Sequence, residues 1–224
     1  DPLPVTDLHC PLLSLPRAFR TGLDDIPAQI PYLTADPADV ERWQNRLPTD
    51  GRLRVGLVWS GDPRPHNPRA NAVDRRRSLT LDDLAPLGAI AGAAEGIAFF
   101  SLQKGSAAAQ AKTPPEGLAL IDWMDEVGDF ADTAALISGL DLVITVDTSV
   151  AHLAGGLGKP VWVLSRYGGC WRWLTERDDS PWYPTLRLFH QPEPGNWAPT
   201  VAAVARELEA LCPHPARTPC TTKT

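Results

Sequence analysis

The sequence of 224 residues predicts an α/β fold built on a doubly wound parallel sheet. Three observations support this prediction. Apolar runs of strand length alternate with helix-like segments from residue 53 to residue 211. The run at 142–146 (LVITV) is β-branched or aliphatic throughout, which is typical of a strand covered on both faces. Strands and helices that alternate at this spacing imply right-handed βαβ units and therefore a parallel sheet.

The chain divides into three parts. Residues 1–50 are interrupted by prolines and are predicted to form a linker or extended arm. Two short helices are expected within it, at 12–19 (LLSLPRAF) and 35–47 (ADPADVERWQNRL). Residues 51–211 are predicted to form one Rossmann-like domain. Residues 212–224 are polar and broken by prolines, and are predicted to be a disordered tail.

Within the domain, each predicted strand is an apolar run and each predicted helix has a start or stop signal. The predicted strands are 53–61, 96–103, 118–123, 142–146, 161–164 and 186–191. The predicted helices are 79–92, 106–112, 129–140, 149–157 and 199–211. Asp82 and Asp83 suit a first helical turn, while Gly158 and Pro160 end a helix. The segment 62–78 is hydrophilic and rich in arginine, and is predicted to be a long loop.

The composition fits a globular protein, because 43% of the residues are hydrophobic. The formal net charge of −6 argues against a general binder of nucleic acid or membrane surfaces, since both are anionic. Neither a membrane-spanning run nor a signal peptide is found, so a cytoplasmic protein is expected. The four cysteines form no CxxC pair, and we expect no metal and no cofactor. The first residue is Asp, as in a processed chain or a piece of a longer protein.

The polar turn after the strand at 142–146 is the strongest candidate for a functional site. Asp147, Thr148 and Ser149 follow the strand directly, and His152 falls in the first turn of the next helix. In open α/β sheets, ligands bind outside the carboxyl ends of the strands, and helix N-termini there favour phosphate. The alternative is that the three polar residues only cap the helix and that His152 is only a histidine with satisfied hydrogen bonds in a seam between helix and sheet.

Residues that follow the first predicted strand should share this edge of the sheet. Ser60 and Gly61 leave that strand, and a glycine there allows the backbone to come close to a ligand. Arg77 and Ser78 are expected at a helix entrance, where a guanidinium and a hydroxyl can grip phosphate together. The arginines just before them are expected to face solvent.

Two further pairs follow other strands. Gln103 and Lys104 leave the second strand, and the lysine either neutralises a diphosphate or merely faces solvent. Asp132 and Thr133 cap or line the first turn of a predicted helix. Their loop, including Asp129 and Phe130, either contacts a base or ribose or is an ordinary capping arrangement. The tryptophan-rich segment 171–183 can stack on a sugar or base, although core or inter-domain packing is the favoured interpretation.

Several of these motifs together resemble a known family. The run at 129–164 (DFADTAALISGLDLVITVDTSVAHLAGGLGKPVWVL) resembles the carboxyl-terminal half of heptosyltransferase-like glycosyltransferases of family nine, with their D-[ST]-x-x-x-H-L-A turn. The pieces VGLVWSGDP, RRRSL, FFSLQKG, WRWL, SPWYP and LRLF resemble the glycosyltransferase-like domain at the C-terminus of bacterial tetratricopeptide-repeat proteins. The resemblance covers roughly residues 8–211.

The resemblance implies one half of a GT-B architecture, in which two Rossmann-like domains face each other across a cleft. This half would bind a nucleotide-sugar or nucleoside diphosphate, and the sugar would be transferred with inversion and without a tightly bound metal. An N-terminal acceptor domain or a repeat domain of the same longer protein would be its partner. By position, the residues facing the donor would be Asp147, Thr148, Ser149 and His152, with Lys104 and Arg77 compensating the diphosphate.

Two departures and three alternatives accompany this interpretation. The family usually has glycine where this chain has Ser149. Only one Rossmann-like unit fits into residues 51–211, so the acceptor domain and its catalytic base are not found. The alternatives are half of a sugar-nucleotide epimerase, a non-catalytic interaction module derived from a glycosyltransferase, and a dinucleotide oxidoreductase. The last is disfavoured because WSGDPRPHN, not GxGxxG, follows the first strand.

Overall fold

The computed structural model describes residues 5–94 and 96–212. Within them a six-stranded, wholly parallel sheet has the strand order β3-β2-β1-β4-β5-β6. The strands are β1 (Leu53–Val58), β2 (Ile97–Ser101), β3 (Leu120–Ile121), β4 (Leu142–Val146), β5 (Val161–Ser165) and β6 (Leu186–His190). The predicted fold class is confirmed. The order reverses between β1 and β4, so their carboxyl ends form the point where such sheets bind ligands.

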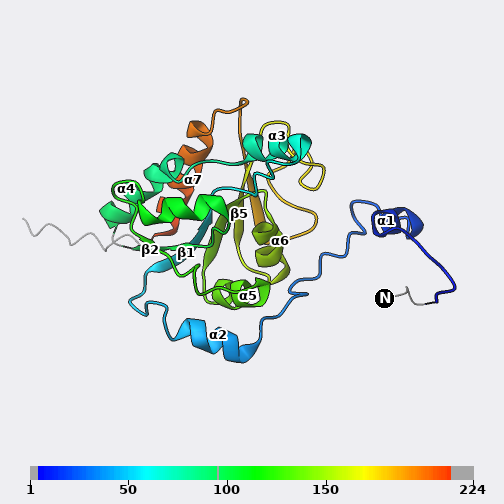
Figure 1. Ribbon diagram of the computed structural model, residues 1–224, viewed down its shortest axis with the longest axis horizontal. Helices are drawn as coiled ribbons and strands as arrows, with labels where there is room; N and C mark the ends of the chain where they lie inside the picture. Colours follow the sequence, from blue (N-terminus) through cyan, green and yellow to red (C-terminus); the bar gives the residue numbers. More distant parts are fainter. Residues whose placement is uncertain (1–4, 95, 213–224) are drawn as a thin grey trace, which may run out of the picture.

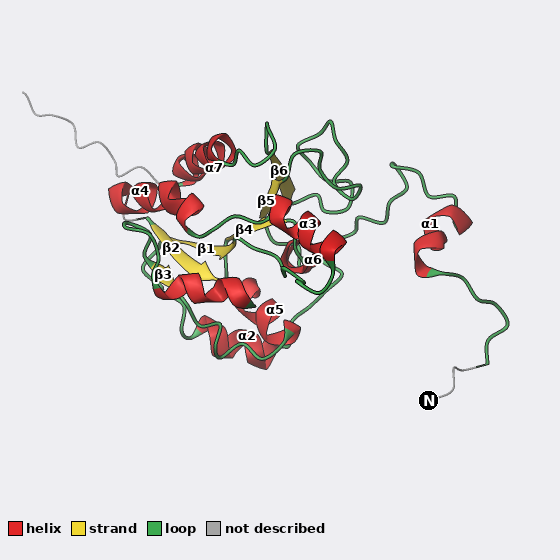
Figure 2. Cartoon of the chain, turned by 45° about the horizontal axis from the view of Figure 1, so that its top comes forward, coloured by secondary structure: helices red, strands yellow, loops and turns green. Residues whose placement is uncertain are grey.

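Helices cover both faces of the sheet (Figure 2). Helices α4 (Ala85–Ala94) and α7 (Ala198–Leu211) pack together on one face. Helices α5 (Phe130–Ser138) and α6 (Ser149–Gly156) cover the other, with α2 (Pro37–Gln44) packed against α5. None of the helices within the described ranges is both long and apolar enough to cross a membrane.

The side chains of β4 explain why its sequence is apolar throughout. Leu142, Ile144 and Val146 belong to the hydrophobic cluster under α4 and α7, whereas Val143 belongs to the cluster under α5 and α6. All of these side chains are buried because successive residues of a strand point to opposite faces. The absence of hydrophobic alternation at 142–146 therefore reflects a strand between two cores.

Three predicted segments differ from the structure. The segment 62–78 contains the helix α3 (Pro68–Arg77), which begins with Asn67 as its N-cap and a proline in its first turn. The weak helix expected at 106–112 is the 3₁₀ helix η3 (Ser106–Lys112). The expected helix at 79–92 begins with the 3₁₀ turn η2 (Asp82–Leu84) before α4.

The proline-rich residues 5–50 divide into a part that lies apart from the domain and a part that packs on it. Its first helical turns, η1 (Leu12–Ser14) and α1 (Leu15–Ala18), lie apart from the sheet and its helices (Figure 1). From Tyr32 onward the segment packs on the domain: Trp43 is 1% exposed, and the N–H groups of Tyr32 and Leu33 both donate to the carbonyl of Gly156. The disordered tail predicted at 212–224 lies outside the described residues except for Cys212, which is buried.

Candidate functional site

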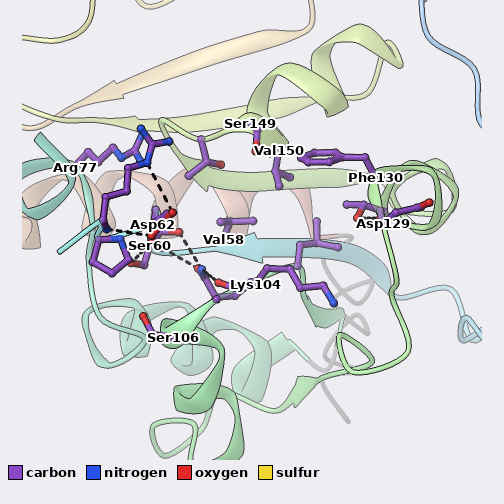
Figure 3. Close-up of a pocket in the computed structure, with 18 of the residues that line it drawn as sticks. Val58, Ser60, Asp62, Arg77, Lys104, Ser106, Asp129, Phe130, Ser149 and Val150 are labelled. Carbon is purple, nitrogen blue, oxygen red and sulfur yellow. Dashed lines mark hydrogen bonds and ion pairs between the residues drawn. The ribbon is translucent and has the colours of Figure 1, made fainter. Parts of the chain in front are cut away.

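A cleft of about 920 Å³ opens at the carboxyl ends of β1, β2 and β4, where the strand order reverses. Ser149 and Val150 form one side of it, while Phe130 and Arg77 lie at its two ends (Figure 3). The predicted site residues that line the cleft are Ser60, Gly61, Arg77, Gln103, Lys104, Thr133, Thr148 and Ser149. Those that do not line it are Ser78, Asp132, Asp147 and His152.

The N-terminus of α6 enters the cleft without a side-chain cap. Its N-cap residue is Thr148, whose hydroxyl lies 3.0 Å from the hydroxyl of Thr145 instead of accepting a helix N–H. In α2, α3 and α5, by contrast, a side chain of Asp36, Asn67 or Asp129 accepts a hydrogen bond from the first turn. The first turn of α6 therefore borders the cleft without a side-chain cap, at the positive end of the helix dipole. The capping alternative does not describe Thr148.

Arg77, at the end of α3, reaches the backbone that follows β4 at the reversal point. Its Nη1 donates to the carbonyl of Asp147 at 2.7 Å, and its Nε and Nη2 lie 3.0 Å and 2.9 Å from Oδ1 of Asp74. Asp74 is only 4% exposed. Because a guanidinium has five N–H groups, two remain for a ligand. The expectation that Arg77 opens a helix is wrong, since it is the last residue of α3.

Gly61 makes room for this ion pair. A Cβ at position 61 would overlap the side chains of Asp74 and Arg77. The N–H of Gly61 donates to the hydroxyl of Ser78 at 3.0 Å, so Ser78 holds the loop from outside the cleft. The glycine thus admits the Arg77 side chain, whereas the sequence suggested that it admits a ligand.

Lys104 lines the cleft, but its ammonium already has protein partners. It donates to the backbone carbonyls of Met124 and Val127, in the loop between β3 and α5. One of its three N–H groups remains available. Lys104 therefore neither simply faces solvent nor is wholly free for a diphosphate.

Asp132 and Thr133 have different surroundings. Asp132 accepts the N–H of Gly128 at 2.8 Å and pairs with Arg42; the hydrogen bond from Gly128 is the main cause that lowers the pKa of Asp132. Its carboxylate lies between α2 and α5 and does not line the cleft. Thr133 lines the cleft while its hydroxyl donates to the carbonyl of Asp129 at 2.8 Å.

His152 packs away from the cleft lining. Its ring stacks on Trp173, with centroids 5.0 Å apart and planes 12° apart, and its Nδ1 lies 3.0 Å from the hydroxyl of Tyr183. Burial lowers the pKa of His152, against the opposing effect of Asp147. The half-buried imidazole is therefore neutral near pH 7, and it packs in a seam between α6 and the 171–183 segment instead of between helix and sheet.

Some lining residues were not among the predicted site residues. Phe130 is 56% exposed at one end of the cleft, and Asp62 and Ser106 contribute polar groups. Phe130 belongs to the loop that the sequence associates with a base or ribose, and a large apolar residue in the first turn of a helix at the ligand edge is out of place on a solvent face. The buried Asp74, which pairs with Arg77 without lining the cleft, carried no such signal, since it stands in an arginine-rich stretch that is typical of a surface.

Comparisons with known proteins relate this chain to glycosyltransferases. Residues 128–169 match the model of Glycosyltransferase family 9 (heptosyltransferase). Protein FlbA of Caulobacter vibrioides is 30% identical over 196 residues, which are 85% of this chain and 31% of FlbA. The chain therefore spans less than a third of that relative.

Solved structures show the same fold at low identity. ADP-heptose LPS heptosyltransferase II of E. coli has a TM-score of 0.55 at 15% identity, over 84% of this chain and 56% of that one. E. coli heptosyltransferase WaaC with ADP has a TM-score of 0.53 at 16% identity, over 92% and 57%. A family 9 glycosyl transferase of Veillonella parvula has a TM-score of 0.53 at 12% identity, over 80% and 53%. The chain thus has the Rossmann-like fold found in heptosyltransferases and spans little more than half of their length.

Proposed function

We propose that this chain binds a nucleotide-sugar through its diphosphate and serves as the donor-binding part of a glycosyltransferase. The observation that carries the proposal is the N-terminus of α6, which enters the cleft uncapped at the reversal point of the sheet. An anion at this position receives backbone N–H groups and the positive end of the helix dipole. Arg77 lies at the same cleft with two unused N–H groups.

The two ends of the cleft suggest how a nucleotide would lie. Phe130 provides an exposed aromatic face at one end, which suits the stacking of a base. Asp129 stands beside it, and its carboxylate is able to accept hydrogen bonds from ribose hydroxyls. The diphosphate would then reach the α6 N-terminus and Arg77. The structurally similar E. coli heptosyltransferase WaaC was solved with ADP, which supports a nucleoside diphosphate as the ligand here.

The same groups would assist transfer of the sugar. As the bond to the sugar breaks, negative charge develops on the departing diphosphate, and fixed N–H groups and cations stabilise that charge most. The acceptor and the base that removes its proton would come from a second domain of a longer protein, with inversion at the sugar carbon. This division of labour follows the resemblance to GT-B enzymes.

A pair of substitutions at Ser149 tests the proposal. Ser149 is exposed, and its side chain has no hydrogen bond within the described structure. Ser149→Asp adds a carboxylate to the first turn of α6, where the dipole favours it by about 0.3–1 kcal/mol, but this charge repels a bound diphosphate. Ser149→Asn is the neutral control.

Binding is measured by calorimetry with ADP, UDP and GDP, and stability by thermal unfolding. We expect wild type and Ser149→Asn to bind at least one of these ligands, and Ser149→Asp to lose most of that affinity with no loss of stability. Failure of the wild type to bind any nucleoside diphosphate, or equal binding by Ser149→Asp, would overturn the proposal.

A further inference from the structure

Gln103 follows β2 and is 2% exposed, although it borders the cleft. Its Oε1 accepts the N–H groups of Trp59 at 3.0 Å and Ser60 at 2.8 Å. Its Nε2 donates to the carbonyls of Ser60 at 2.9 Å and Lys104 at 2.8 Å. Both lone pairs and both hydrogens of the amide are thus used within the protein. Gln103 has no hydrogen-bonding capacity left for a ligand.

The side-chain amide of Gln103 adds hydrogen bonds just beyond the point where the backbone hydrogen bonds between β1 and β2 end. Between β1 and β2 the hydrogen bonds run as far as the N–H of Leu102, which donates to the carbonyl of Leu57. Beyond this point the chain after β1 turns away to form one wall of the cleft. The Gln103 side chain binds the backbone of Ser60 through both its N–H and its carbonyl, so it fixes where that wall begins.

The wall is held by side chains on its other side as well. The N–H of Gly61, the next residue, donates to the hydroxyl of Ser78. The position of Gly61 in turn determines the space into which Asp74 and Arg77 fit. A shift of the Ser60 backbone would therefore move Gly61 and displace the guanidinium of Arg77.

We propose that Gln103 is a positioning residue, which sets nucleotide affinity by holding the Ser60–Gly61 backbone without touching the ligand. This inference rests on the proposed function and adds a residue whose effect is indirect. It predicts that affinity follows the hydrogen bonds of the amide, and hydrogen exchange without ligand separates this effect from direct repulsion between the new charge and a diphosphate.

Gln103→Glu gives a test with a distinctive pH profile. The new carboxyl has nearly the same shape, and in either protonation state it accepts the N–H groups of Trp59 and Ser60. When ionised it faces the carbonyls of Ser60 and Lys104 with no hydrogen to donate. When protonated it regains one of these two hydrogen bonds. Lowering the pH should therefore restore part of the wild-type geometry.

Calorimetry with ADP at pH 5 and pH 8 compares the variant with wild type at each pH, so that titration of the ligand and of other groups cancels. We expect about tenfold or greater weakening at pH 8 and recovery to within about threefold at pH 5. Gln191→Glu is a control for a new buried carboxyl outside the cleft. Gln191 is 3% exposed, its Oε1 accepts the N–H of Tyr167, and it does not line the cleft.

Hydrogen exchange at the amides of Trp59 and Ser60 supplies a readout that needs no ligand. We expect faster exchange in Gln103→Glu than in wild type at pH 8, with a smaller difference at pH 5. A folded variant that binds ADP like wild type at both pH values would overturn the inference, even if its melting temperature fell. A loss of affinity that does not change with pH would also overturn it. If wild type binds no nucleotide, the proposed function fails. Amide exchange at Trp59 and Ser60 that is the same in Gln103→Glu and wild type would overturn the positioning role of Gln103, whether or not a nucleotide binds.

Discussion

Nδ1 of His152 lies 3.0 Å from the hydroxyl of Tyr183. The same hydroxyl lies 3.3 Å from that of Tyr32, whose N–H donates to the carbonyl of Gly156 at the end of α6. Burial raises the pKa of Tyr183 above its usual value, so its hydroxyl stays protonated. These contacts attach the segment around Tyr32, which precedes α2, to α6. The histidine of the D-T-x-x-x-H turn thus belongs to a packing seam one turn away from the cleft.

The environment of His152 predicts how stability depends on pH. Because burial lowers its pKa, the unfolded chain binds more protons than the folded protein between the folded pKa and about 6.5. The contribution of His152 to stability is therefore complete above about pH 6.5 and is lost as the pH falls toward the folded pKa. Each unit of pKa lowering corresponds to about 1.4 kcal/mol.

Urea unfolding of wild type and His152→Gln across pH 4–8 measures this contribution. The difference in unfolding free energy between the two proteins should shrink as the pH falls. A difference that is constant over this range would show that His152 titrates alike in the folded and unfolded states.

Gly61→Ala should disturb both stability and binding. The added methyl would overlap the Asp74–Arg77 pair, and overpacking of this kind typically costs about 1–3 kcal/mol. Gly105→Ala is a suitable control, since Gly105 also borders the cleft but has open space around its missing Cβ. Its φ of 77° and ψ of −160° lie in a backbone region that is essentially restricted to glycine, so alanine there adds backbone strain of about 1–3 kcal/mol without crowding the cleft. Unfolding by urea and ADP calorimetry should show a loss of affinity in Gly61→Ala alone; equal losses in both variants would contradict this.

Lys104→Met keeps the aliphatic stem and removes the ammonium. The carbonyls of Met124 and Val127 would lose a charged donor, at a cost of about 1–3 kcal/mol if water does not replace it. We expect nucleotide affinity to fall by about tenfold, because a cation at the cleft is lost. Lys104→Arg, which keeps the charge, should retain more affinity. Equal affinity in all three proteins would show that Lys104 only fastens the loop between β3 and α5.

The 224-residue chain alone should not transfer sugar at an enzymatic rate. Transfer needs donor, acceptor and base in one geometry, and the described residues form one Rossmann-like unit with a donor-type cleft. Of the nearby acids, Asp74 is buried in its ion pair, whereas Asp62 lines the cleft with an exposed carboxylate. Release of nucleoside diphosphate from a panel of nucleotide-sugars and acceptors is the measurement. Sustained turnover that is lost in Asp62→Asn would contradict the prediction and identify a base.

Local patterns were enough to predict the sheet and the edge at which the cleft lies. The apolar run at 142–146, between a helix and a polar turn, indicates a buried parallel strand whichever partners it has. The carboxyl ends of parallel strands meet at one edge, so the residues that leave β1, β2 and β4 had to come together. Helix α3 was missed because its arginines hide any apolar periodicity, and its N-cap Asn67 was the signal that remained.

The sequence by itself determined the fold class, the polar edge of the sheet and many of the residues that gather there. Only the tertiary structure decided which of these residues have hydrogen bonds to spare. Backbone groups occupy the side-chain amide of Gln103, and Tyr183 occupies Nδ1 of His152. Asp74 takes part of the hydrogen-bonding capacity of Arg77. The first turn of α6, by contrast, has no side-chain cap. Such assignments depend on distances of about 3 Å between groups far apart in the chain, and no local pattern encodes those distances.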